Sequence, residues 1–217
     1  MQQKPFKLSG EYYDALYKSK NYKKEVEYIL NRIKKLYKNK KINILDLGCG
    51  TGQHLKILSQ KGHTITGVDI SNEMLKSIKK NKKITLIKSN IINLKTNKKN
   101  KFDMVICMFH VINYLKNQNQ LKKLFEVVNF NLKKHGEFIF ETYDTKGVNH
   151  HLPEIRMKKI YTKKFELVRL ALPTRYFNLS KTVINYKFFY KNKNSHTWRN
   201  FSETHSMRDF SKNEILS

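Results

Sequence analysis

Three glycines that alternate with other residues form the part of this sequence whose spacing points most directly to chemistry. Gly48, Gly50 and Gly52 follow the apolar run 42–47. Because glycine has no Cβ, a backbone built from it can turn tightly and approach a ligand closely. The N–H groups at the start of a following helix would face the same point. The spacing therefore predicts a ligand-binding loop at the end of a strand.

A carboxylate stands at the end of the next apolar run. Asp69 lies 17 residues after Gly52, and its side chain can accept hydrogen bonds from both hydroxyls of a ribose. Ligands of open α/β sheets bind at the carboxyl ends of the strands. The loop reads G-x-G-x-G, with Gln53 next, whereas dinucleotide-binding folds have G-x-G-x-x-G. The pattern favours a ribose-containing ligand other than NAD. The two alternatives are an NAD site and tight turns that bind no ligand.

Apolar runs and helical spacing alternate along the first two thirds of the chain. Strands are predicted at residues 42–47, 64–68, 84–88, 104–109 and 137–142. Helices are predicted at residues 11–38, 52–61, 72–80 and 118–132, with Ser71 placed to cap the third of them. The order β-α-β-α-β-β-α-β predicts an α/β fold, a doubly wound, Rossmann-like parallel sheet with helices on both faces.

The pattern changes after residue 150. The segments 158–172, 182–191 and 196–207 are rich in Tyr, Phe, Val and Thr and roughly alternate, which predicts an antiparallel β insert with a turn at 191–194. Ser211 and Glu214 have the spacing of a capping box. A helix is therefore predicted to begin at 211, close to Ser217, and we interpret the C-terminus as truncated.

These elements divide one predicted domain, residues 1–217, into four parts. Residues 1–40 are expected to form an N-terminal helical lid and 41–146 the Rossmann-like core. Residues 147–210 are expected to form the antiparallel insert and 211–217 the start of an incomplete helix.

The formal net charge of +27 invites a nucleic-acid partner. However, 38 of the 44 basic residues are lysines, which are scattered along the chain, whereas phosphate and base recognition favours arginine. We therefore expect a solvated surface rather than a nucleic-acid interface. No apolar run reaches the length of a membrane span. The two cysteines, Cys49 and Cys107, form no disulfide framework, and a cytoplasmic protein is predicted.

The segments 46–52 and 67–75 together resemble motifs I and II of the class I S-adenosylmethionine-dependent methyltransferases. The resemblance implies S-adenosylmethionine as cofactor. Its aminocarboxylate would lie at the loop that contains Asp46, Gly48, Cys49, Gly50 and Gly52, and Asp69 would bind its ribose.

The same resemblance assigns residues to the adenine. Ile70 and Met74 would flank the ring. The family often places an acidic residue after the third strand; here that position is Asn90, whose amide oxygen can accept from the adenine amino group. Ile91 would be an apolar contact.

A narrower resemblance covers most of the chain. The segments 13–17, 21–25, 107–115 and 203–208 are similar to the N,N-dimethyltransferases of deoxyamino sugars. That likeness implies a helical lid, an antiparallel insert and a homodimer, which we expect to form through the insert. It places Tyr17 and Tyr22 on the cofactor as lid tyrosines, and Met108 beside it.

Methyl transfer to an amine requires that the nitrogen lose a proton. His110 and Tyr114 follow the fourth predicted strand, at the edge where the acceptor should bind. His110 could accept a proton near neutral pH, and the resemblance places Tyr114 toward the substrate. The alternative for both residues is packing above the sheet.

The sequence thus favours a methyltransferase that N-methylates a small-molecule acceptor, such as a nucleotide-linked amino sugar. Two other readings stay open, a methyltransferase of RNA or protein that uses the basic surface and a catalytically silent, truncated remnant. His150 and His151 are adjacent but lack a third ligand nearby, so no metal site is predicted.

Overall fold

The computed structural model describes residues 5–79, 81–96 and 101–217. These residues form two compact units. The core unit comprises Ser19–Ile112 and Asn117–Thr142. The sheet unit comprises the chain up to Lys18, Asn113–Lys116 and Tyr143–Ser217. Each is described by itself.

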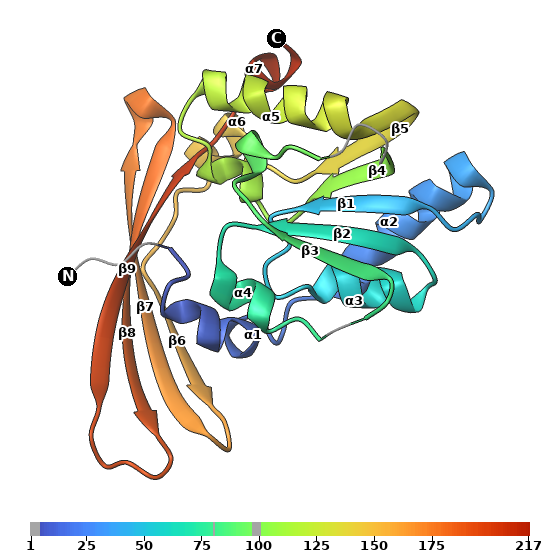
Figure 1. Cartoon of the computed structure of the whole chain (residues 1–217). Helices are drawn as coiled ribbons and strands as arrows, with labels where there is room; N and C mark the ends of the chain where they lie inside the picture. Colours follow the sequence, from blue (N-terminus) through green and yellow to red (C-terminus); the bar gives the residue numbers. More distant parts are fainter. Residues whose placement is uncertain (1–4, 80, 97–100) are drawn as a thin grey trace. The chain divides into compact units, whose positions relative to one another are not determined.

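A five-stranded sheet forms the centre of the core unit (Figure 1). Its strands are β1 (Asn43–Leu47), β2 (Thr64–Asp69), β3 (Ile84–Lys88), β4 (Phe102–Cys107) and β5 (Leu132–Phe140). They pair in the order β3-β2-β1-β4-β5, and all pairs are parallel. The predicted doubly wound sheet is confirmed. Because the strand order reverses between β1 and β4, the loop after β1 lies at the topological switch point, where such sheets bind ligands.

Helices cover both faces of this sheet (Figure 1). On one face, α2 (Tyr22–Tyr37) and α3 (Gln53–Gln60) bury Ile29 and Leu55 against β1, β2 and β4. On the other face, Phe125 of α5 (Gln118–Asn131) contacts Phe138 and Phe140 of β5 edge-on. The short elements are α4 (Asn72–Lys76), η2 (Ile91–Asn93) and η3 (Val111–Tyr114).

Side-chain caps set where these helices begin. The side chains of Asn21, Ser71 and Asn117 accept from the backbone N–H of Lys24, Met74 and Gln120. The cap at Ser71 confirms the sequence prediction. The prediction of one helix over 11–38 is wrong, because the Asn21 cap starts α2 afresh after η1 (Ser9–Tyr12) and α1 (Tyr13–Leu16).

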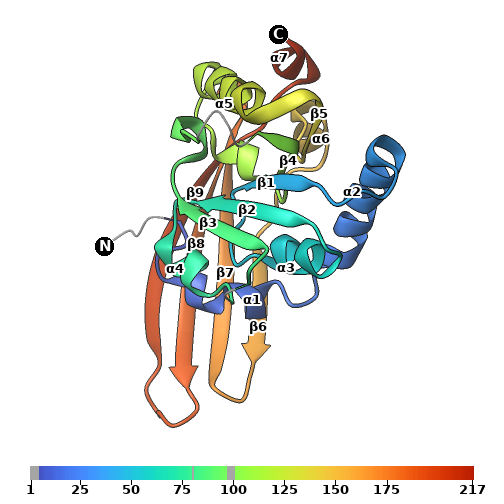
Figure 2. The same cartoon turned by 45° about the vertical axis from the view of Figure 1, so that its right-hand side comes forward.

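The sheet unit contains four long antiparallel strands that lie side by side (Figure 2). They are β6 (Arg156–Tyr161), β7 (Phe165–Tyr176), β8 (Lys181–Asn192) and β9 (Arg199–Arg208), in sequence order, with η4 (Phe177–Leu179) after β7. The antiparallel insert is confirmed, but the predicted strand 158–172 is two strands joined at 162–164. Tyr12 and Leu16 pack on Leu167 and Phe188 of this sheet. Within the predicted lid of residues 1–40, η1 and α1 belong to the sheet unit and α2 belongs to the core unit, and the lid itself stays a prediction.

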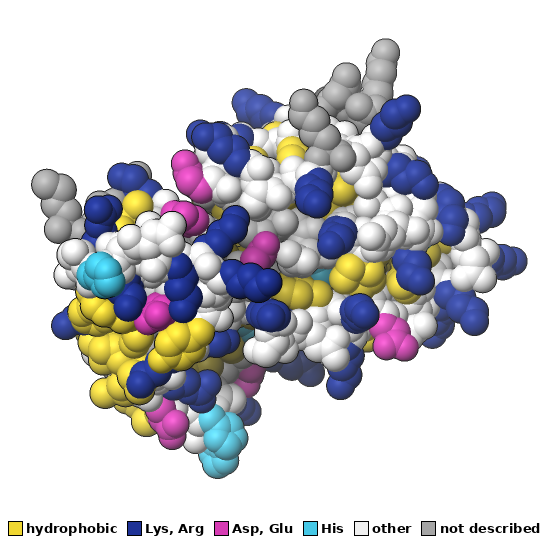
Figure 3. Space-filling view, turned by 90° about the horizontal axis from the view of Figure 1, so that it is seen from below, with side chains coloured by type: hydrophobic (Ala, Val, Ile, Leu, Met, Phe, Trp, Pro, Cys, Tyr) yellow, Lys and Arg dark blue, Asp and Glu magenta, His cyan; other side chains and the backbone are white. Residues whose placement is uncertain are grey.

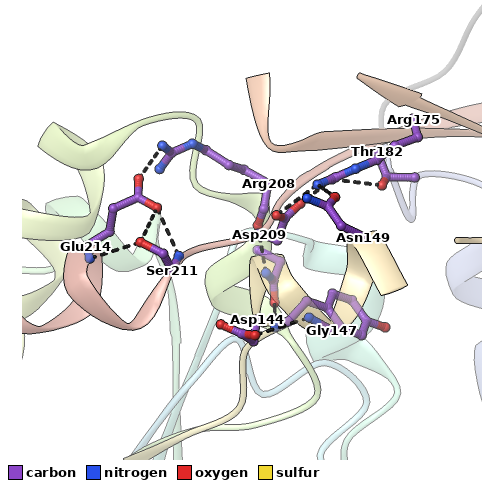
Figure 4. Close-up of polar contacts among 11 residues, drawn as sticks. Asp144, Gly147, Asn149, Arg175, Thr182, Arg208, Asp209, Ser211 and Glu214 are labelled. Carbon is purple, nitrogen blue, oxygen red and sulfur yellow. Dashed lines mark hydrogen bonds and ion pairs between the residues drawn. The ribbon is translucent and has the colours of Figure 1, made fainter. Parts of the chain in front are cut away.

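Polar contacts fix the last segments of the sheet unit (Figure 4). Asp144 caps α6 (Thr145–His150), a helix that the sequence pattern did not indicate. The Arg175 guanidinium forms a buried ion pair with Asp209. The predicted capping box is present in α7 (Lys212–Leu216), where Ser211 and Glu214 bond reciprocally. Within the described residues, no helix is long and apolar enough to cross a membrane.

Candidate functional site

The loop after β1 is built on left-handed glycines. Gly48, Gly50 and Gly52 have φ angles of +79°, +54° and +76°, a region that residues with a Cβ rarely adopt. The N–H groups of Gly48 and Cys49 both donate to the carbonyl oxygen of Val68, at 2.8 and 2.9 Å. These bonds hold the loop to the end of β2 and lead it into α3.

Only one of the three glycines faces open space. A Cβ at Gly48 would lie 2.5 Å from the side chain of Val111, and one at Gly52 would lie 2.9 Å from Ile78. A Cβ at Gly50 would meet no described atom within 4 Å. Gly50 is therefore the point where a ligand can approach bare backbone.

Asp69 joins this loop to the end of β2. Its Oδ2 accepts from the Gly50 N–H at 2.9 Å, and its Oδ1 accepts from the Ser71 N–H at 2.8 Å. Burial raises the pKa of Asp69, and the backbone donors Ser71, Gly50 and Ile70 oppose that rise. A carboxylate offers about four acceptor positions, so Asp69 can bond these amides and still accept from ligand hydroxyls.

Asp46 lies in β1, two residues before Gly48, and is 1% exposed. Its Oδ2 has no hydrogen-bond partner among the residues that the structure describes. The pKa of Asp46 is raised to about 6, because burial and the nearby Asp69 raise it by more than His54 lowers it. A buried acceptor of this kind is costly unless a donor reaches it, so the site is suited to a cationic ligand group.

Substituting Asp46 by asparagine should change how stability depends on pH. Between the ordinary pKa of 3.8 and about 6, the folded state keeps a proton on Asp46 that the unfolded state has lost. Stability therefore falls as pH rises through that window, by about 3 kcal/mol. Asp46→Asn cannot ionise. Its unfolding free energy, relative to wild type in urea titrations, should rise by about 3 kcal/mol from about pH 4 to about pH 7. An unchanged difference would contradict this assignment.

Three polar side chains that the sequence analysis did not select form a cluster in the core unit, and one of them, His54, lowers the pKa of Asp46. His54 of α3 is 6% exposed, and its Nε2 lies 2.8 Å from Oε2 of Glu25 on α2. Lys20 pairs with Glu25 and stands over the Phe109 ring, 3.9 Å from its centroid. Burial raises the pKa of Glu25, but the bonds from His54 and Lys20 outweigh it and lower the pKa. Because His54 and Glu25 are 29 positions apart in sequence, spacing alone carried no signal for their contact.

The residues predicted to bind adenine differ in exposure. Ile70, directly after Asp69, is 67% exposed, whereas Met74 and Ile91 are buried. Asn90 is exposed, and its side-chain oxygen accepts from the Ile92 N–H at 3.2 Å. Cys49 and Met108 are buried, as core residues. All of these residues belong to the core unit, and their roles toward a cofactor stay predictions.

His110 and Tyr22 also belong to the core unit. Burial lowers the pKa of His110, while Glu141 raises it and Lys20 lowers it. The imidazole is therefore neutral at neutral pH and can accept a proton. Glu141 accepts from the Phe109 N–H at 2.6 Å, which fixes the backbone before His110. The Tyr22 ring contacts His54 edge-on, with centroids 5.3 Å apart.

Tyr17 and Tyr114 belong to the sheet unit. The Tyr17 ring lies against Tyr13, with centroids 4.7 Å apart. The Tyr114 hydroxyl lies 2.7 Å from Nδ1 of His205. A small pocket of about 10 Å³, close to the space of one water, is lined by aromatic and basic side chains, among them Tyr13, Tyr17, Arg169, Tyr186 and His205.

Comparison with known proteins identifies the family of the chain. A family model described as a methyltransferase domain matches residues 38–203. A solved S-adenosylmethionine-dependent methyltransferase from Clostridium acetobutylicum is 25% identical, with a TM-score of 0.71, over 94% of this chain and 81% of that one. The sugar N-methyltransferase KedS8 from Streptoalloteichus sp. is 20% identical, with a TM-score of 0.82, over 94% and 81%.

Several curated relatives carry specific names. A ubiquinone biosynthesis O-methyltransferase from Rickettsia typhi is 33% identical over 101 residues, 44% of this chain and 40% of that protein. The dTDP-3-amino-3,6-dideoxy-alpha-D-glucopyranose N,N-dimethyltransferase from Streptomyces fradiae is 28% identical over 120 residues, 54% of this chain and 46% of that protein. The chain spans 64% of the length of another curated relative, which is less than two thirds.

The glycine loop, the Asp69 carboxylate and the parallel sheet that positions them agree with these matches. The chain belongs to the methyltransferase domain family and has the class I fold of S-adenosylmethionine-dependent methyltransferases.

Proposed function

We propose that this chain binds S-adenosylmethionine in the core unit and transfers its methyl group to the nitrogen of a small amine. The observation that carries the proposal is the junction of Gly50, open to a ligand, with the Asp69 carboxylate, 2.9 Å from its N–H. The unpartnered oxygen of Asp46 supports it, because the amino group of the cofactor is a cationic donor.

In this mechanism, the residues of the core unit would bind and orient the cofactor. Asp69 would accept from the ribose hydroxyls, Asp46 would accept from the amino group, and the bare backbone at Gly50 would leave room for the amino-acid portion. S-adenosylmethionine supplies a methyl group already activated by a sulfonium. The protein therefore contributes alignment, exclusion of water and a place for the proton that leaves the amine.

The acceptor class that we favour is a nucleotide-linked amino sugar. Its support is the likeness to an enzyme named for a dTDP-linked 3-amino sugar and to a structure titled a sugar N-methyltransferase.

The test is a turnover assay with purified protein and S-adenosylmethionine. Acceptors are dTDP-3-amino-3,6-dideoxyglucose, the matching 3-hydroxy sugar and total RNA. The proposal predicts S-adenosylhomocysteine formation with the amino sugar, whose mass rises by one or two methyl groups, and none with the hydroxy sugar. Methylation of RNA instead would favour the basic-surface reading. Cofactor binding without turnover on any acceptor would favour the silent remnant.

The distribution of basic side chains does not favour an RNA substrate. In Figure 3, Lys and Arg side chains are spread over the face that is shown rather than gathered in one stripe. Recognition of a nucleic acid would favour a continuous basic patch. We therefore keep a small molecule as the proposed partner.

We also infer a homodimer through the antiparallel sheet. Tyr12 and Leu16 cover the face that carries Leu167 and Phe188. The opposite face exposes Met157 by 60% and Phe189 by 37%, and Figure 3 shows hydrophobic side chains gathered over this sheet, at the left. Large exposed apolar patches are typical of interfaces.

A second copy suits this face because a two-fold axis pairs a surface with itself. The face carries Lys187 and Glu166 on neighbouring strands, so two copies can bring opposite charges together. Sedimentation should show a dimer for wild type and a monomer for the double variant Met157→Asp, Phe189→Asp. A wild-type monomer at assay concentrations would contradict the inference.

A further inference from the structure

His54 connects the glycine loop to the first turn of α2, and all of these residues belong to the core unit. It is the second residue of α3, directly after the loop that contains Gly50 and Gly52. Its imidazole is buried, and its Nε2 lies 2.8 Å from Oε2 of Glu25 on α2. The Tyr22 ring contacts the imidazole edge-on. The first turn of α2 therefore holds His54 in one orientation.

The charge of Glu25 decides which nitrogen of His54 carries a hydrogen. Burial raises the pKa of Glu25, but the bonds from His54 and Lys20 outweigh burial and lower it. Glu25 is therefore a carboxylate at neutral pH and can only accept hydrogen bonds, so Nε2 of His54 is the donor in their contact. Lys20 pairs with the other oxygen, Oε1. Both oxygens of Glu25 are thus bonded, which fixes the position of the imidazole.

Asp46 is the group on which the charge of His54 acts. The pKa of Asp46 is raised to about 6 by burial and by Asp69, and His54 opposes this rise. The buried thiols of Cys49 and Cys107 also lie near Asp46, and because burial raises their pKa they stay neutral. The ionisation of Asp46 therefore depends on the positive charge of a protonated His54.

The ionisation of Asp46 matters for one portion of the proposed cofactor. Oδ2 of Asp46 has no hydrogen-bond partner among the described residues. As a carboxylate it attracts an ammonium group strongly, whereas a protonated carboxyl attracts it only as a neutral acceptor. The adenosine portion is uncharged and is much less sensitive to that difference. A group that keeps Asp46 ionised therefore acts mainly on the amino-acid end of the ligand.

We propose that Glu25 and His54 are positioning residues for an ammonium subsite at Asp46, a role that rests on the proposed function. Glu25 orients the imidazole and offsets its positive charge. The protonated imidazole in turn stabilises the Asp46 carboxylate, which accepts from the ammonium group. Neither positioning residue needs to contact the ligand. Through them, the first turn of α2 determines how strongly the loop after β1 selects ligands that carry an amino group over ligands that lack one.

Titration calorimetry with two probes tests this role. S-adenosylhomocysteine carries the amino-acid portion, whereas 5′-methylthioadenosine keeps the adenosine and the sulfur but lacks the amino and carboxyl groups. We expect His54→Gln to bind S-adenosylhomocysteine about tenfold more weakly than wild type at about pH 6, and to bind methylthioadenosine within about twofold of wild type. The loss should shrink as pH rises to about 8, because Asp46 is then ionised without His54.

Further variants separate the effect of charge from an effect on structure. Glu25→Gln should show a smaller loss of the same kind, because its amide still accepts from Nε2 but no longer offsets the imidazolium charge. His135→Gln and Glu27→Gln, which replace exposed residues of the same unit, are the matched controls and should bind both probes as wild type does. In Asp46→Asn, which cannot ionise, adding His54→Gln should cause no further pH-dependent loss.

A loss that is equal for both probes and constant with pH would assign His54 a structural role and overturn the proposal. A pH-dependent loss that persists in the Asp46→Asn background would also overturn it. Thermal unfolding verifies the fold of each variant, and if His54→Gln does not fold, Glu25→Gln decides by the same criteria. If wild type binds neither probe, the proposed function fails. If wild type and His54→Gln bind both probes equally at every pH, the positioning role alone is refuted.

Discussion

Asp69→Ala is expected to weaken S-adenosylmethionine binding by at least about 100-fold. Hydrogen bonds to a charged group contribute about 1.5–3 kcal/mol each, and the two ribose hydroxyls would lose such bonds together. Each 1.4 kcal/mol is tenfold in affinity. The Gly50 and Ser71 N–H groups also lose the acceptor that they share, so the loop would lose one of its links to the end of β2, while the bonds to Val68 remain.

Equilibrium dialysis with labelled cofactor measures this effect, with thermal unfolding to verify the fold. Asp69→Asn keeps neutral acceptors and should fall between alanine and wild type. Glu126→Ala, which removes an exposed carboxylate of the same unit, is the matched control and should bind as wild type does. Equal affinity of Asp69→Ala and wild type would remove Asp69 from the site.

Gly50→Val should reduce binding about tenfold to 100-fold while the protein stays folded. Its Cβ meets no described atom within 4 Å, so the cost to folding comes from the φ of +54°, about 1–2 kcal/mol. The added side chain would occupy the space where the ligand approaches, and overpacking of this kind costs about 1–3 kcal/mol.

Gly48→Ala separates folding from binding at the same loop. Its Cβ would lie 2.5 Å from Val111, so it should destabilise the fold more than Gly50→Val does. Gly147→Ala, with open space around its Cβ, is the control. Unfolding midpoints and dialysis affinities measured on the same preparations distinguish the two effects. If Gly50→Val binds normally, the loop is not the point of approach.

Local patterns predicted the core sheet well because they depend on neighbouring residues. The runs at 64–68 and 84–88 are β2 and β3 with an end shifted by at most one residue. The caps at Ser71 and Ser211 follow from residue type and spacing over one turn. The strand before Gly48 and the one before Asp69 are neighbours in register, so their ends had to meet.

Features set by distant partners were not predictable in this way. β5 begins at Leu132 rather than at the predicted 137, because Leu132 pairs with Phe102 before the register shifts. His54 meets Glu25, and Tyr114 meets His205, across 29 and 91 positions of sequence. The roles of the predicted site residues toward cofactor stay predictions.

The central claim is that the Gly50 backbone and the Asp69 carboxylate together hold an adenosyl sulfonium. Titration calorimetry of the wild-type protein with S-adenosylmethionine tests it most directly. The account predicts saturable binding at one site per chain that S-adenosylhomocysteine competes away and NAD does not. The absence of binding heat and of competition at millimolar cofactor, with the protein folded, would contradict it.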